Sequence, residues 1–156
     1  DMPFLKRYSE EKIRRNPELR GKDISSMKKS FTRFSRYPVS IFIFAEGTRF
    51  TKEKKGLQSS PFNNLLLPKP GGIGLTLSTM PYINKMIDFS IKYESDKKTF
   101  WAFLCGEMNE AIVKVNLIDI PQKLLGGDYS EDEIYRDDLK NWLYDIWQEK
   151  DKFLSS

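Results

Sequence analysis

The sequence predicts an α/β domain with a mixed, largely parallel sheet flanked by helices. Residues 39–45 form an uncharged run rich in Val, Ile and Phe, hydrophobic on both faces, which is typical of a buried strand in such a sheet. Near the other end, Ser130 opens a capping box followed by apolar residues at helical spacing, which indicates a helix that docks on the sheet. The 156 residues are 39% hydrophobic and 31% charged and carry no repeat, so we expect one globular domain.

Two helices are expected before this strand. Ser9 is placed to cap a short helix that Pro17 interrupts. Asp23 can cap a second helix, which has apolar residues at three- and four-residue spacing and ends at Pro38. After the strand, residues 51–60 are polar and charged without periodicity, so we expect a loop beside the end of the strand.

The later part of the chain predicts one more helix and three more strands. A glycine-rich helix is expected over 71–77, where the glycines suit either an anion at the helix start or close packing against a strand. Strands are expected over 87–93, 100–105 and 111–118, because these segments are rich in apolar residues or alternate in polarity. The single cysteine, Cys105, is expected in the core and excludes an internal disulfide.

Charge is distributed unevenly along the chain. The net charge is +4, but residues 1–60 carry fifteen Lys and Arg against seven Asp and Glu, and the remainder carries eleven against fifteen. A basic first part suits anionic lipid headgroups, phosphate substrates or nucleic acid, and also a solvated surface without a partner. No base-reading motif is present, so no nucleic-acid partner is expected. No apolar run in this chain approaches the roughly 20 residues that a transmembrane helix needs.

Polar residues gather directly after the apolar run at 39–45. Glu46, Gly47, Thr48 and Arg49 stand together, and ligands of open α/β sheets bind at the carboxyl ends of strands. Gly47 permits a sharp turn, and the planar fork of Arg49 suits a phosphate. Pattern alone equally allows a solvated turn in which Glu46 and Arg49 pair with each other.

The segment Phe44–Phe50 closely resembles the Phe-Pro-Glu-Gly-Thr-Arg block of glycerolipid acyltransferases that act on lysophosphatidic acid and related lysophospholipids, with Ala45 in place of proline. Asp1–Ser9 looks like the family's preceding block, and Leu67–Gly72 and Met86–Tyr93 look like its two later blocks. The order and spacing are similar to those of the bacterial branch related to lysocardiolipin acyltransferases. The resemblance extends over nearly the whole chain and implies a glycerol-3-phosphate-acyltransferase-like fold.

The chain departs from the family pattern at the catalytic block, His-x-x-x-x-Asp, which in the family precedes the region that resembles Asp1–Ser9. This chain contains no histidine. We therefore expect residues 1–156 to be the C-terminal part of a single acyltransferase domain, with the catalytic His and Asp and the membrane-anchoring helices upstream. The 156-residue chain by itself is expected to be inactive.

The resemblance implies transfer of a fatty acyl group from acyl-CoA or acyl carrier protein, as co-substrate, to the glycerol hydroxyl of a lysophospholipid, without a cofactor or metal. Arg7 and Arg49 would hold the acceptor phosphate, with Lys69 as a third cation. Glu46 would orient glycerol hydroxyls or hold Arg49, and Thr48 would add a hydroxyl contact. The resemblance further implies a protein bound to an anionic membrane surface at the cytoplasmic face.

Two other classes of protein fit the same residues. The first is a non-catalytic module of the same fold that binds anionic lipid and retains the phosphate clamp without the base. The second is an unrelated α/β domain in which Glu46–Arg49 is incidental.

Overall fold

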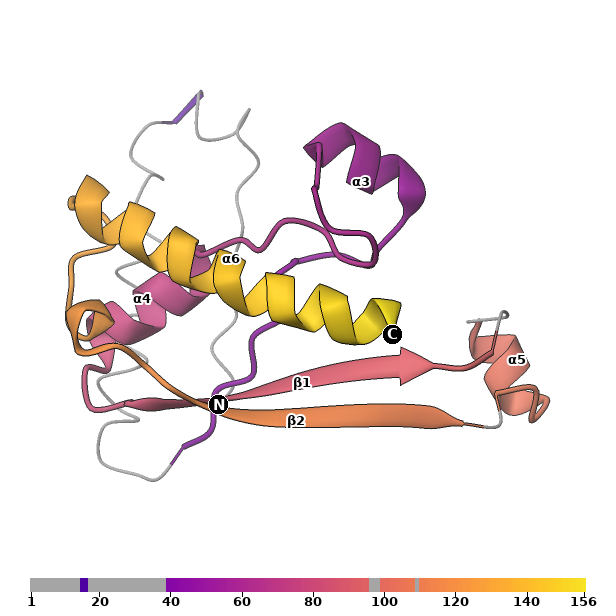
Figure 1. Ribbon diagram of the computed structural model, residues 1–156. Helices are drawn as coiled ribbons and strands as arrows, with labels where there is room; N and C mark the ends of the chain where they lie inside the picture. Colours follow the sequence, from indigo (N-terminus) through magenta and orange to yellow (C-terminus); the bar gives the residue numbers. More distant parts are fainter. Residues whose placement is uncertain (1–14, 17–38, 96–98, 109) are drawn as a thin grey trace.

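The computed structural model describes residues 15–16, 39–95, 99–108 and 110–156, and this part of the chain is a small mixed α/β protein (Figure 1). Arg7 and the helices expected from Ser9 and from Asp23 lie outside the described residues. The described elements follow in the order α3 (Lys52–Gln58), α4 (Gly71–Thr79), β1 (Lys85–Tyr93), α5 (Phe100–Leu104), β2 (Ala111–Asp119), the 3-10 turn η2 (Gln122–Leu124) and α6 (Glu133–Ser155).

The strands β1 and β2 form a long antiparallel hairpin with α5 at its tip (Figure 1). Their register runs from Lys85 opposite Asp119 to Tyr93 opposite Ala111. Strands were expected at both places and are confirmed. Within the described residues, however, the sheet has two strands and is antiparallel, so the expectation of a largely parallel sheet is not met there.

The segment 39–45 is not a strand, and the expectation of a buried strand there is wrong. Phe42 and Phe44 are 81% and 89% exposed, and of the seven residues Ala45 alone is buried. A strand that is apolar on both faces needs cover on both faces and backbone partners at its edges. Here the chain leaves Ala45 in a turn, and the carbonyl of Ala45 accepts the N–H of Lys69 at 2.7 Å.

Two further segments are helical where a loop and a strand were expected. Residues 51–60 contain α3, whose first turn is capped by the Thr51 hydroxyl, which accepts the N–H of Lys54 at 3.2 Å. The apolar run 100–105 contains α5, capped in the same way by Thr99. Cys105 lies exposed at the end of α5, so the core position expected for it is wrong. An uninterrupted apolar run such as 100–105 is compatible with a helix or a strand. The side-chain caps at Thr51 and Thr99 mark the starts of the two helices.

The glycine-rich helix is confirmed as α4, and the structure explains one of its glycines. A Cβ atom added at Gly74 would lie 2.2 Å from the ring of Tyr129, so this ring lies directly against the helix. The backbone N–H of Tyr129 also donates to the hydroxyl of Ser78 at 3.2 Å. Close packing therefore accounts for Gly74, although its partner is a tyrosine and not a strand.

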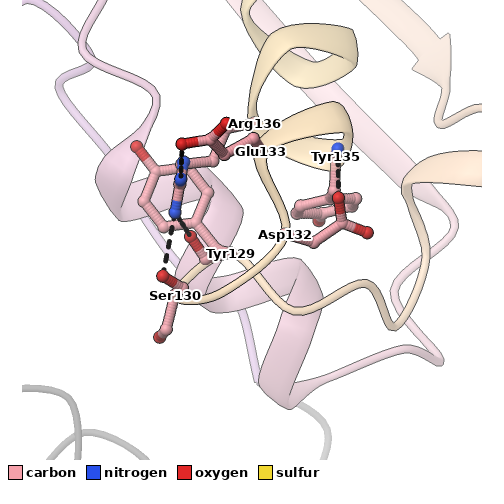
Figure 2. Close-up of polar contacts among 6 residues, drawn as sticks. All are labelled: Tyr129, Ser130, Asp132, Glu133, Tyr135 and Arg136. Carbon is pink, nitrogen blue, oxygen red and sulfur yellow. Dashed lines mark hydrogen bonds and ion pairs between the residues drawn. The ribbon is translucent and has the colours of Figure 1, made fainter.

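The start of α6 is fixed by side chains that bond to backbone groups (Figure 2). Its N-cap is Asp132, whose carboxylate accepts a backbone N–H three residues later at 3.0 Å, so the cap expected at Ser130 lies two residues too early. The guanidinium of Arg136 donates to the carbonyls of Tyr129 (3.3 Å) and Ser130 (2.8 Å). These bonds tie the loop that covers α4 to the first turn of α6.

The core forms where α6 crosses the hairpin and α4. Four residues at four-residue spacing, Tyr135, Leu139, Leu143 and Trp147, make the buried stripe of the helix. This stripe packs with apolar residues from the loop before α4, from α4 and from the segment after β2, namely Phe62, Leu65, Ile73, Leu77, Ile120 and Leu124. The docking of α6 on the sheet, expected from the sequence, is confirmed by its contacts with β1.

The two faces of the hairpin differ sharply in polarity. The face toward α6 carries the polar side chains Asp88 and Ser90, both buried. The opposite face is apolar and 47–65% exposed, and consists of Ile87, Phe89, Ile91, Val113, Val115 and Leu117. The polar inner face holds the buried ion pair between Asp88 and Lys150 of α6.

Candidate functional site

The site is built on a tight turn at Phe44–Gly47. The N–H of Gly47 donates to the carbonyl of Phe44 at 2.9 Å, and Gly47 has a φ of +68°, which favours glycine because a Cβ is strained there. The bond from the Lys69 N–H to the Ala45 carbonyl holds this turn against the segment that leads into α4. The turn therefore has a fixed position, and Lys69 lies beside it with an exposed side chain.

The side chain of Glu46 is half-buried. Burial raises the pKa of its carboxyl above the ordinary value of 4.5, against the opposing effects of a backbone hydrogen bond from Leu66, the ammonium of Lys150 and the indole of Trp147. Among the described residues no ion pair joins Glu46 to Arg49, so the self-paired turn is not what the structure shows. The role of Glu46 in holding Arg49 has no support from these contacts.

Trp147 contributes an indole N–H to this interior. Trp147 is 6% exposed, and its indole nitrogen is buried with no hydrogen-bond partner in the described part of the chain. The indole nevertheless lowers the pKa of Glu46.

Lys150 is the buried cation of the site. Its ammonium donates to a carboxylate oxygen of Asp88 at 2.5 Å and to the carbonyl of Phe89 at 3.2 Å. It also lies 4.8 Å from the centre of the Trp147 ring, at the distance of a cation–π contact. The side chains of Lys150 and Asp88 are only 12% and 10% exposed, so this ion pair belongs to the interior.

The outer side of the turn is open to solvent and cationic. Thr48 and Arg49 are exposed, and Lys54 of α3 donates to the Thr48 hydroxyl at 2.7 Å and to the Arg49 carbonyl at 3.3 Å. The ammonium of Lys54 is thus held beside the Thr48 side chain and the backbone of Arg49. A hydroxyl, an ammonium and a guanidinium together offer several donors to an anion.

Of the six residues predicted from the sequence, four lie on the turn or directly after it: Glu46, Gly47, Thr48 and Arg49. Lys69 is tied to the turn by its backbone, and Arg7 is outside the described residues. The sequence reasoning missed Lys54, Asp88, Trp147 and Lys150. Two signals were present: a carboxylate inside the apolar strand 87–93, and Thr51 as a cap for the helix that carries Lys54.

The described residues include no group of three or more His, Cys, Asp and Glu side chains placed to hold a metal ion. No helix within the described ranges is both long enough and apolar enough to span a bilayer. Comparison of the chain with protein-family models, with curated proteins and with solved structures gave no match. Function is therefore inferred from the residues and contacts of the turn.

Proposed function

We propose that this chain is the acceptor-binding part of an acyltransferase that moves a fatty acyl group from acyl-CoA or acyl carrier protein to the glycerol hydroxyl of a lysophospholipid such as lysophosphatidic acid. The observation that carries the proposal is the two-sided turn. One side of it presents Thr48, Arg49 and Lys54 to solvent, and the other side keeps the Glu46 carboxylate in a half-buried, polar setting. A phosphorylated alcohol has an anion and a neutral hydroxyl to match those two sides.

The two sides of the turn would bind different parts of the acceptor. Arg49 would take the phosphate through two parallel hydrogen bonds, because a guanidinium fits phosphate oxygens in a bidentate manner. Lys54 and Lys69 would add point charges, and Arg7 remains part of the proposed clamp. Glu46, which only accepts hydrogen bonds when ionised, would orient the glycerol hydroxyl for attack on the thioester.

The base that takes the hydroxyl proton must come from elsewhere in the protein, because the chain has no histidine. We place the His-x-x-x-x-Asp block upstream of residue 1, on the basis of the resemblance of Phe44–Phe50 to the family's motif. The mixed, largely parallel sheet belongs to the same proposal. In it, the exposed outer face of β1 and β2 would be covered. Association with an anionic membrane at the cytoplasmic face, in lipid synthesis or remodelling, follows from the substrate.

A second candidate is a non-catalytic module that binds anionic lipid through the same turn. The absence of histidine from all 156 residues is the observation that favours it. This module would bind the phosphate of a lipid but would not transfer an acyl group.

The test is a product assay with the full-length protein, including the sequence upstream of Asp1. The protein is incubated with lysophosphatidic acid and acyl-CoA, and phosphatidic acid is measured by mass spectrometry. Formation of phosphatidic acid, abolished when the upstream histidine is replaced by alanine, is the expected result. Sedimentation of the protein with vesicles that contain phosphatidic acid, without any product, would assign the second function instead.

A further inference from the structure

The most exposed large apolar side chains of the described residues lie around the Phe44–Gly47 turn. Phe44, Leu57 and Phe42 are 89%, 86% and 81% exposed, more than any other large apolar side chain in this part of the chain. Single exposed apolar residues are normal on a soluble protein, but here the three extreme cases fall together within residues 42–57. This grouping indicates an interaction surface around the turn.

Phe42 and Phe44 are directed outward by the packing of their neighbours. Ile41 packs against buried apolar residues of α4 and its C-terminal cap. A Cβ atom added at Gly72, at the start of α4, would lie 3.5 Å from a methyl carbon of Ile43. Packed and exposed residues thus alternate along this segment, as side chains do in an extended chain. Because Ile41 and Ile43 face α4, the two phenylalanines face away from it.

Leu57 joins this surface from α3. The helix has no buried residue and lies at the margin of the molecule (Figure 1). Its Lys54 donates to the Thr48 hydroxyl and to the Arg49 carbonyl, so the helix face that carries Lys54 adjoins the turn. Leu57 is three residues after Lys54 and therefore lies on the same face of the helix.

The charges between these apolar side chains are mainly positive. Residues 42–58 contain four Lys and Arg against two Glu. Arg49 and Lys52 are exposed, as is Lys69 beside the turn, whereas Glu53 is exposed and Glu46 is half-buried. Large apolar side chains interspersed with cations match the boundary of an anionic bilayer, where phosphates lie directly above acyl chains.

We propose that the surface formed by Phe42, Phe44, Arg49, Lys52 and Leu57 docks on the headgroup region of an anionic lipid bilayer. The two phenylalanines and Leu57 enter the boundary of the acyl chains, and the cations pair with lipid phosphates. The inference rests on the proposed function for its partner, because a lysophospholipid acceptor resides in a bilayer with its phosphate among the headgroups. It places Arg49 at the level where that phosphate lies.

Docking is measured by flotation of the 156-residue chain with vesicles made of equal parts of phosphatidylcholine and phosphatidylglycerol. Phe42→Ser and Leu57→Ser should each weaken binding roughly tenfold, because a large apolar side chain no longer leaves water. Lys52→Gln should weaken it roughly fivefold, and this loss should vanish on vesicles of phosphatidylcholine alone. All three positions are exposed, so far-UV circular dichroism should show an unchanged fold.

Matched controls come from other exposed positions. Ile134→Ser and Lys140→Gln change exposed side chains of α6 and should leave vesicle binding unchanged. Trp101→Ser tests α5, whose aromatic residues are also exposed, and should leave binding unchanged as well. Binding by Phe42→Ser equal to that by Ile134→Ser would overturn the proposal, as would a loss confined to Trp101→Ser.

A second copy of the chain is the alternative occupant of this surface. It would appear as a dimer in analytical ultracentrifugation that Phe42→Ser dissociates, without binding of the wild-type chain to vesicles. That result would overturn the proposal.

Kinetics on the full-length protein separates this surface from the proposed function. Phe42→Ser should lower kcat/KM roughly tenfold for lysophosphatidic acid presented in vesicles and leave it unchanged for a short-chain acceptor dissolved as monomers. An equal loss with the dissolved acceptor would contradict the bilayer role of Phe42. Vesicle binding that depends on Phe42, in a protein that transfers no acyl group, would refute the proposed function and leave the docking surface intact.

Discussion

Replacing Lys150 by methionine should destabilise the protein strongly, because it leaves Asp88 as an unpaired charge in the interior. The two side chains are 12% and 10% exposed and are joined at 2.5 Å. Removal of one partner from a buried pair costs about 3–5 kcal/mol of unfolding free energy. For a domain of this size, about 1 kcal/mol corresponds to roughly 2–4 °C, so Tm should fall by roughly 6–20 °C.

The assay is urea unfolding followed by far-UV circular dichroism, with thermal unfolding of the same samples. The m-value should stay constant, so that a lower midpoint reports a lower free energy of unfolding. Asp88→Asn should be nearly as costly, whereas the double variant should recover a large part of the loss, because neither charge is then left alone. Lys152→Met, which breaks an exposed pair, should cost less than about 1 kcal/mol. A Lys150→Met variant as stable as Lys152→Met would refute the buried pair.

Three further predictions concern the turn and its supports. Burial raises the pKa of Glu46 above 4.5, so the stability that its protonated form provides is present at low pH and lost as the pH rises through the raised value. Glu46→Gln should therefore raise Tm at pH 7 by about 1–3 °C and leave it unchanged below about pH 4, and a lower Tm at pH 7 would contradict the sign. Gly74→Ala should cost about 1–3 kcal/mol in urea unfolding, because its methyl group meets the Tyr129 ring, whereas Gly56→Ala, with open space around it, should stabilise by about 0.5–1 kcal/mol. Asp132→Ala should cost about 1 kcal/mol by loss of the cap of α6, and Asp132→Asn much less; equal losses would disprove the cap.

The elements that could be predicted from the sequence are those with a signal in their own residues. The alternation in 111–118, the β-rich run 87–93, the glycine-opened helix and the apolar stripe of α6 each mark their state locally. The strand predictions for 39–45 and 100–105 were wrong because an apolar stretch is compatible with a strand, a helix or an uncovered segment. Thr51 and Thr99 are suitable helix caps, but the composition of the residues that follow them favoured a loop and a strand, respectively.

The candidate site also contains residues that could be predicted from the sequence and residues that could not. The turn residues Glu46 to Arg49 are adjacent in the sequence, so their chemistry could be predicted from their types. Lys150 lies about a hundred residues from this turn in the sequence, and the docking of α6 on β1 places it in the ion pair with Asp88. No pattern within α6 distinguishes a lysine that enters the interior from Lys152, which stays in solvent.

The most direct test of the central claim is the acceptor preference of the Arg49→Lys variant of the full-length protein. Lysine keeps the charge but loses one of two parallel hydrogen bonds to phosphate, and a charge-assisted bond contributes about 1.5–3 kcal/mol. The proposal predicts a roughly ten- to hundredfold lower kcat/KM for lysophosphatidic acid, with kcat/KM for monoacylglycerol and Tm nearly unchanged. A lower Tm with an unchanged ratio between the two acceptors would contradict the phosphate clamp and assign Arg49 to the scaffold.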